Sequence, residues 1–129
     1  MTTKAKHLKT GRKGERMAMA ELRRLGMEII AQNYTFQNIG EIDIVARDGG
    51  VLCFIEVKTR HQKENSAYSP ADAVTSKKRD RLRKTAHAYL TKYNLKHLTW
   101  RYDIMEIYLG EYFWQHQRNL IIAVFSDHK

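Results

Sequence analysis

The sequence is poor in the features on which secreted and membrane proteins depend. It has a single cysteine, Cys53, so an internal disulfide is excluded and a reducing compartment is expected. Its longest unbroken apolar run, residues 51–55, is far shorter than a membrane span. Residues 1–10 are basic but have no apolar segment behind them, which argues against a signal peptide. We therefore expect a cytoplasmic protein that does not associate with membranes.

The sequence also has no sign of a domain boundary, and it has few acidic residues compared with basic ones. No repeat, low-complexity tract or linker rich in proline, glycine and serine divides the 129 residues. A mobile basic arm at residues 1–10 and a single domain at residues 11–129 are therefore expected. Lysine and arginine number 23 against 14 aspartates and glutamates, which gives a formal net charge of +9. Because these cations are clustered, a nucleic acid partner is favoured over a basic protein that binds no polyanion.

The apolar pattern predicts helices before and after a group of strands. The predicted elements are a helix over residues 12–25, strand-like stretches over residues 27–36 and 40–58, a helix over residues 76–93 and a strand over residues 100–109. The stretch 40–58 contains two strands joined at Asp48-Gly49-Gly50, which is a strong hairpin signal. For the apolar segment 118–125 the pattern leaves the element type open. The order indicates a mixed α/β or α+β fold with a central sheet.

Two opposite charges interrupt the apolar stretch "LCFIEVKTR". Alternation along a strand places Glu56 and Lys58 on the same face as Leu52 and Phe54. Burying an unpaired charge is costly, so such groups are normally paired, bound to a metal or located at a cleft. The stretch therefore predicts a core strand that ends at a special site.

The preceding strand, "GEIDIVA", has the same pattern. Alternation places Glu41 and Asp43 on one face, and Ile42 and Ile44 on the other. Hairpin pairing across the Asp-Gly-Gly turn would bring this acidic pair beside the charged end of the next strand. One hairpin register thus gathers three carboxylates and one ammonium group at one end of a sheet.

Each predicted helix carries a charge on its apolar side, near its N-terminal end. Glu15 lies three and seven residues before Ala18 and Leu22, and Lys78 lies four residues before Leu82. Gly14, next to Glu15, is interpreted as part of a flexible entry to the first helix. Both helices are therefore expected to bring one charge toward the sheet.

These residue types suit metal-assisted hydrolysis of phosphodiester bonds. Mg²⁺ commonly takes only one or two carboxylates, and Asp43 and Glu56 are the candidate ligands. Lys58 would hold the attacking water or oppose charge on the phosphate, Glu15 would orient water, and Lys78 would contact the phosphate. For any one of these residues, an ordinary buried ion pair is the simpler interpretation. The set as a whole favours a site.

The basic stretch "SKKRDRLRK" is a second candidate surface. A solvated helix face and contact with phosphates explain it equally well. We predict nucleic acid contacts by Lys77, Lys78 and Arg81 on this helix. We also predict a contact by Arg60, in the polar loop expected directly after the "EVK" strand.

Four segments together resemble a known family. In order along residues 11–107, "GRKGERMAMAELRRLG", "GEIDIVARDGGVLCFIEVKTR", "AVTSKKRDRLRKTAHAYL" and "RYDIMEI" resemble the blocks of the YraN-like family of small bacterial proteins. That family is similar to the PD-(D/E)xK nuclease superfamily and, within it, to archaeal Holliday-junction resolvases. The resemblance implies a restriction-endonuclease-like α-β-β-β-α-β core, with a three-stranded antiparallel meander and a further strand flanked by helices.

The resemblance also implies roles for single residues. Asp43 matches the first motif's aspartate, Glu56 and Lys58 match the (D/E)xK pair, and Glu15 matches the glutamate of the first helix. Ile42 stands where the superfamily has a proline, but that proline is not a ligand. The implied activity is that of a Mg²⁺- or Mn²⁺-dependent endonuclease acting on DNA in repair or recombination, with branched or damaged DNA as candidate substrates. Since resolvase-like relatives often act as dimers, a homodimer is an open expectation.

Two alternatives to catalysis remain. The first is a nucleic-acid-binding module that keeps the fold and the basic surface, whose affinity falls steeply with salt but needs neither Asp43 nor Glu56. The second is a regulatory or scaffolding protein in which the acidic set is a buried ion-pair network.

Overall fold

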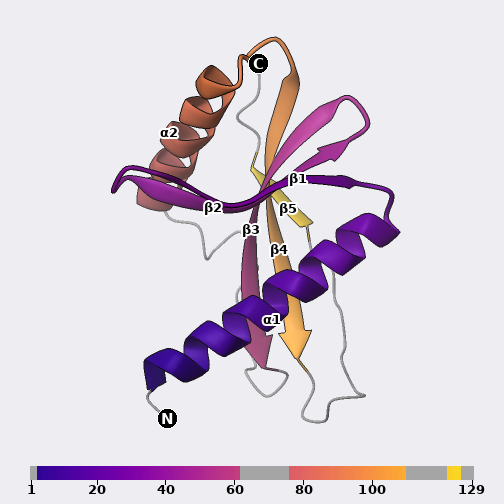
Figure 1. The fold of residues 1–129 in the computed structure, drawn as a ribbon, viewed down its shortest axis with the longest axis vertical. Coiled ribbons are helices and arrows are strands. Elements are labelled where there is room, and N and C mark those ends of the chain that lie inside the picture. The colour runs from indigo at the N-terminus through magenta and orange to yellow at the C-terminus, as the bar shows by residue number, and fades with distance from the viewer. Residues whose placement is uncertain (1–2, 62–75, 110–121, 126–129) are drawn as a thin grey trace.

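The computed structural model describes residues 3–61, 76–109 and 122–125, which form a sheet with a helix on each face (Figure 1). The elements are α1 (Thr3–Arg24), β1 (Glu28–Phe36), β2 (Gly40–Asp48), β3 (Val51–His61), α2 (Ser76–Lys92), β4 (Thr99–Leu109) and β5 (Ile122–Phe125). The five strands form one sheet in the order β1-β2-β3-β4-β5. β1, β2 and β3 form an antiparallel meander, β4 is parallel to β3, and β5 is antiparallel to β4. The predicted fold class is confirmed, and the C-terminal apolar segment contains a strand.

The first helix is longer than the sequence pattern indicates. It begins at Thr3 rather than at about Arg12, so residues 3–10, which were predicted to be a mobile arm, are helical. The lysine, alanine and leucine residues of this segment have good helix propensity, although they form no apolar stripe. Periodicity therefore places the start of the helix too late.

The β2–β3 hairpin has the turn that the sequence predicts. Asp48 pairs with Val51, which leaves Gly49 and Gly50 as a two-residue loop. Gly49 has a φ of 59°, a left-handed conformation that glycine adopts without steric penalty. This register brings the beginning of β2 alongside the end of β3.

A hydrophobic core lies on each face of the sheet. On the face covered by α1, Leu22 packs in a cluster with Ile44 and Ile55. On the opposite face, covered by α2, Leu90 packs in a cluster with Phe54. Because Phe54 and Ile55 are neighbours in β3, the alternation of this strand separates the two cores as predicted.

The alternation predicted for β2 is wrong at its beginning. Ile42 and Ile44 were expected on one face, yet Ile44 packs in the α1 core and Ile42 in the α2 core. The pairing of β2 with β3 ends at Ile44 and Ile55, so the residues before Ile44 are not held in the pleat of β3. The two strands separate at the position where the charged residues begin.

Two glycines allow the helices to contact the strands closely. A Cβ atom on Gly14 would lie 1.8 Å from Thr59 Oγ1, and one on Gly40 would lie 2.6 Å from Thr85 Oγ1. Gly14 thus lies inside α1, at its contact with β3, and the interpretation as a flexible helix entry is wrong. The close contact fixes the position of the next residue, Glu15, over the end of β3.

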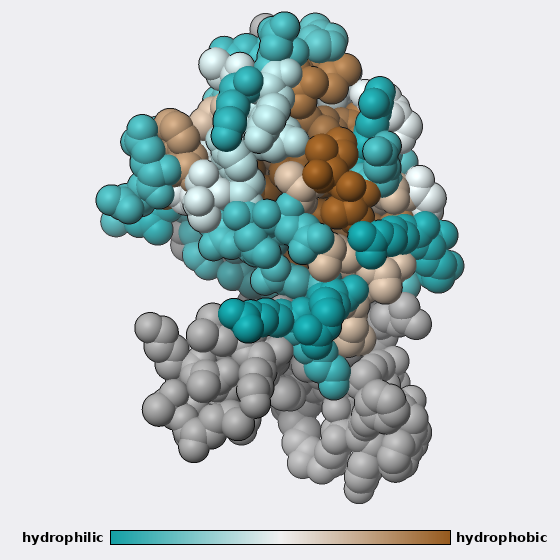
Figure 2. Space-filling model, viewed as in Figure 1, coloured by the Kyte–Doolittle hydropathy of each residue, from teal (hydrophilic) through white to brown (hydrophobic). Residues whose placement is uncertain are grey.

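Neither helix in the described part of the chain is both long enough and apolar enough to cross a bilayer. In the coloured part of Figure 2, hydrophilic side chains surround a hydrophobic patch.

Candidate metal and phosphate site

The candidate site lies where β2 and β3 separate. The last antiparallel pair is Ile44 with Ile55, and Asp43 and Glu56 are the next residues on the two strands. In place of a further ladder contact, the backbone N–H of Val57 donates to Asp43 Oδ2 at 2.8 Å. This bond holds the Asp43 carboxylate between the strands and leaves its second oxygen for another partner.

Asp43 is largely buried and surrounded by other carboxylates. Burial raises the pKa of Asp43 to about 7; the Val57 hydrogen bond opposes this shift, and the charges of Glu15, Glu56 and Glu41 add to it. Four acidic side chains therefore influence one another at this position. Such an excess of negative charge is favourable only with a proton or a cation among them.

Glu56 and Lys58 form an ion pair on the α2 face of β3. Lys58 Nζ lies 3.2 Å from Glu56 Oε1, and both side chains are mostly buried. Within the described residues, the other oxygen of Glu56, Oε2, is buried without a hydrogen-bond partner. The ion pair expected as the simple interpretation is present, but it satisfies only half of this carboxylate.

A second lysine reaches the same point from α2. The amino group of Lys58 lies beside that of Lys78 and lowers the pKa of Lys78, first because a neutral Lys78 amine can accept a hydrogen bond from Lys58 and also because the two charges repel each other. For Lys58, burial opposes the charged form, yet the Glu56 carboxylate raises its pKa overall. Two amino groups from different elements thus meet beside Glu56, which is an arrangement suited to an anion.

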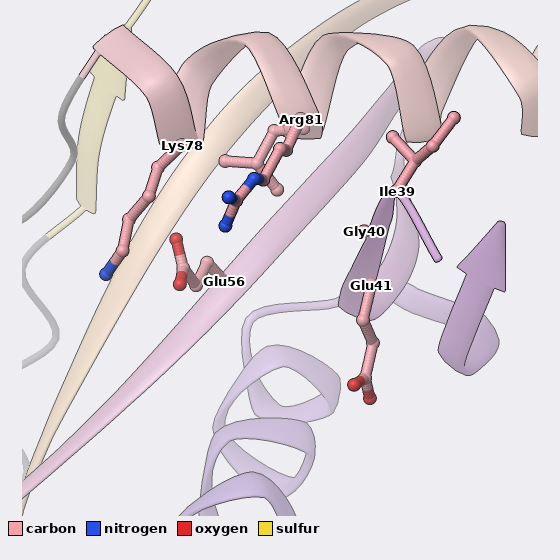
Figure 3. Close-up of a pocket in the computed structure, with 7 residues that line it drawn as sticks. Ile39, Gly40, Glu41, Glu56, Lys78 and Arg81 are labelled. Atoms are coloured by element: carbon pink, nitrogen blue, oxygen red, sulfur yellow. The ribbon is translucent and has the colours of Figure 1, made fainter. Parts of the chain in front are cut away.

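Glu56, Lys78 and Arg81 line a pocket of about 200 Å³ between β2, β3 and α2. Figure 3 shows the Glu56 carboxylate near the side chains of Lys78 and Arg81, whereas Glu41 points away from them. The pocket therefore has cationic groups from the helix above a carboxylate from the sheet.

Glu15 reaches the site from the other face of the sheet, and Asn33 of β1 links it to Glu41. With its amide nitrogen turned toward the two carboxylates, Asn33 donates to Glu15 Oε1 and Glu41 Oε1, each at 3.0 Å. Burial and the charge of Glu41 raise the pKa of Glu15, while Asn33 and Arg12 lower it. Asn33 also has a φ of 51°, a conformation that asparagine tolerates better than most residues. Sequence reasoning missed Asn33, because periodicity gives no signal for a left-handed residue in a strand.

The residues predicted to contact nucleic acid lie in two places, on α2 and at the end of β3. Lys78 and Arg81 line the pocket, and Lys77 is exposed beside them on α2. Arg60 was placed in a loop, but β3 continues through His61, and Arg60 pairs along the backbone with Tyr108 of β4. Its side chain lies outside the described part of the structure, as do residues 62–75.

The oxygen atoms of the site fit a hard divalent cation. Among the described residues, no cluster of three or more histidine, cysteine or acidic side chains could hold a metal ion. Mg²⁺, however, commonly uses one or two carboxylates and completes its shell with water and substrate phosphate. Glu56 Oε2 is a buried oxygen without a partner, and Asp43 lies among carboxylates that a cation would neutralise. Asp43 and Glu56 are therefore suitable ligands.

Comparisons with known proteins place this site inside a matched region. Residues 14–107 match the model of a family described as "Uncharacterised protein family UPF0102". A UPF0102 protein of Koribacter versatilis is 42% identical over 104 residues, which are 80% of this chain and 71% of the relative. A UPF0102 protein of Symbiobacterium thermophilum is 40% identical over 102 residues, which are 79% of this chain and 84% of the relative. A UPF0102 protein of Chlorobium chlorochromatii is 41% identical over 97 residues, which are 75% of this chain and 72% of the relative. These names state no activity.

Proposed function

The chain belongs to the uncharacterised family UPF0102, the YraN-like family that its motifs resemble, and we propose that it is a Mg²⁺- or Mn²⁺-dependent endonuclease. Its substrate is DNA, preferably branched or damaged, and it acts in the cytoplasm. One observation carries this proposal: where β2 and β3 separate, Asp43, Glu56 and Lys58 meet, with one carboxylate oxygen of Glu56 left without a partner.

The acidic residues bind the cation and position water. Asp43 offers the oxygen that Val57 does not use, and Glu56 offers Oε2. A divalent cation held there would neutralise charge on the scissile phosphate and make a water molecule more acidic. Glu15, held by Asn33 on the opposite face of the sheet, orients the water for in-line attack.

The cationic residues bind the phosphate. Lys58 stabilises the negative charge that develops on the phosphate oxygens during attack. Lys78 and Arg81, which line the pocket from α2, hold the phosphate group in place. An anion bound between Lys58 and Lys78 also relieves the repulsion that lowers the pKa of Lys78.

The test is cleavage of labelled fork, flap, four-way and linear duplex DNA by the purified protein in Mg²⁺ or Mn²⁺. We expect cutting of at least one branched substrate and a loss of at least about a hundredfold in rate for Glu56→Gln, which removes the charge but keeps the shape. Glu28→Gln is the matched control, because Glu28 is exposed at the opposite end of the meander. Absence of cleavage on every substrate, or equal rates for Glu56→Gln and the wild type, contradicts the proposal.

The second candidate is DNA binding without catalysis, and the exposed cations Lys77 and Arg81 favour it. In that case affinity falls steeply with salt while Asp43→Asn and Glu56→Gln bind as the wild type does. Metal-independent affinity together with absence of cleavage would select this role over the nuclease.

A further inference from the structure

A groove beside the candidate site belongs to none of the roles given above. It lies between the exposed side of α2 and the β1–β2 turn, and its volume is about 610 Å³. Phe36, Ile39 and Ala88 form its apolar wall, and Lys84 and Lys92 lie along the helix at its edge. Its volume is in the range of sites that hold a small organic group.

The groove adjoins the pocket of the candidate site, with Ile39 between them. Ile39 lines both of them and lies against α2 (Figure 3). Along α2, Lys84 lies three residues after Arg81, and Ala88 lies four residues after Lys84. The three residues therefore share one face of the helix. At about 1.5 Å per residue, Arg81 and Ala88 are roughly 10 Å apart along the axis, a distance that spans more than one nucleotide of a DNA strand.

The charge on this face is available to a ligand. Within the described residues, neither Arg81, Lys84 nor Lys92 forms an ion pair with a carboxylate. The acidic residue of α2, Asp80, pairs instead with Arg83. A chain of phosphates passing along this face would therefore meet three cations that are not engaged in ion pairs with described carboxylates.

We propose that the groove binds an unpaired base of the DNA substrate, whose phosphates contact Arg81, Lys84 and Lys92 as the strand leaves the pocket. This inference rests on the proposed function and narrows its substrate to DNA with a single-stranded segment next to the cleaved bond. The ring of Phe36 and the imidazole of His87 give a base flat surfaces on which to stack. A base inside a duplex cannot enter, because both of its faces are already stacked. The basic edge favours this occupant over an apolar protein segment.

The experiment measures binding in EDTA, so that it does not depend on cleavage. Fluorescence anisotropy compares a blunt duplex with the same duplex carrying a single-stranded tail, at one salt concentration. We expect the wild type to bind the tailed DNA at least about tenfold more tightly, as one stacked base would provide. Phe36→Ala and Ala88→Trp, which empty and fill the groove, should each abolish this preference while binding the blunt duplex as the wild type does.

The controls separate this inference from the proposed function. Leu25→Ala truncates an exposed apolar side chain just after the end of α1 and should keep the preference for the tail. Glu56→Gln should also keep it, because Glu56 lies outside the groove. A wild-type protein that prefers the tail but cleaves no DNA supports the groove and contradicts only the nuclease. Equal affinity for both DNAs, or an unchanged preference in both groove variants, overturns the inference. A groove that binds an apolar dye while the protein shows no tail preference overturns it as well, in favour of a protein partner.

Discussion

Among single residues, Asp43 links the chemistry of the site to the stability of the fold. Its carboxyl has a pKa of about 7 in the folded chain instead of 3.8, mainly because of burial. A carboxyl whose pKa is raised by folding favours the folded state when protonated, so its contribution is complete below about pH 4 and is lost as the pH rises through 7. The ionised form of Asp43, which the proposed cation would require, is therefore the form that destabilises the metal-free protein.

Because the pKa of Asp43 is raised by folding, we predict that Asp43→Asn stabilises the metal-free protein at alkaline pH. Without metal, the variant should unfold at a higher temperature than the wild type at pH 8.5, with a gain of at most about 4 kcal/mol, and the gain should shrink toward pH 5. Thermal melts in EDTA across this range measure it. Asp80→Asn, on the exposed surface of α2, should show no such trend. Lower stability of Asp43→Asn at pH 8.5 would contradict the prediction.

Asp43 should also determine how strongly a divalent cation stabilises the protein. Mg²⁺ at millimolar concentration should raise the melting temperature of the wild type at pH 8.5 and much less at pH 5, where a proton competes for Asp43. Asp43→Asn should respond weakly at both pH values. Calorimetric or fluorescence melts with and without Mg²⁺ check this, and an equal response of the variant and the wild type would remove Asp43 as a ligand.

Asn33 has two functions that substitutions can separate. It donates hydrogen bonds to Glu15 and Glu41, and its backbone is left-handed. Asn33→Ala loses both the donor and the tolerance of this conformation, whereas Asn33→Gly loses only the donor. We expect both variants to cleave DNA more slowly, and the alanine variant to be less stable by about 1 kcal/mol than the glycine variant in urea unfolding. Equal stability of the two would show that the backbone carries no strain.

At the scale of elements, the contact between α1 and β3 depends on Gly14. Alanine in a helix is normally about 1 kcal/mol more favourable than glycine, yet here its Cβ would overlap Thr59 Oγ1. We therefore predict that Gly14→Ala destabilises the fold by about 1–3 kcal/mol and slows cleavage by displacing Glu15. Combining it with Thr59→Ala should recover part of the loss in both measurements. A stabilising effect of Gly14→Ala alone would contradict the close contact.

The sequence predicts the elements better than it predicts where they separate. Alternation identifies β3, Asp48-Gly49-Gly50 predicts the hairpin, and the charges of Glu56 and Lys58 indicate the site. The split of Ile42 and Ile44 between two cores follows from the end of the β2–β3 ladder, which is a property of the assembled sheet. The first turns of α1 have no apolar periodicity and were therefore not predicted. The role of Asn33 was not predicted because the two carboxylates that it contacts come together only after folding.

At the scale of the whole molecule, the net charge of +9 predicts DNA binding that depends steeply on salt. Each phosphate contact contributes about 0.9 to the slope of log affinity against log salt concentration. Replacing Lys77, Arg81 and Lys84 with glutamine should reduce this slope by roughly 2.7 if each contacts one phosphate. Arg23→Gln, in the last turn of α1, is the control and should leave the slope unchanged. An unaltered slope in the triple variant would place the DNA elsewhere.

The Gly49-Gly50 turn makes the hairpin unequally tolerant of changes in length. A two-residue loop is the shortest that joins two antiparallel strands, so a deletion there would force the buried pair of Ile44 and Ile55 out of register. An insertion would only extend an exposed tip, at the end of the hairpin opposite to Asp43 and Glu56. This tip is therefore a suitable attachment point for a fluorophore or an affinity tag that must leave the candidate site untouched.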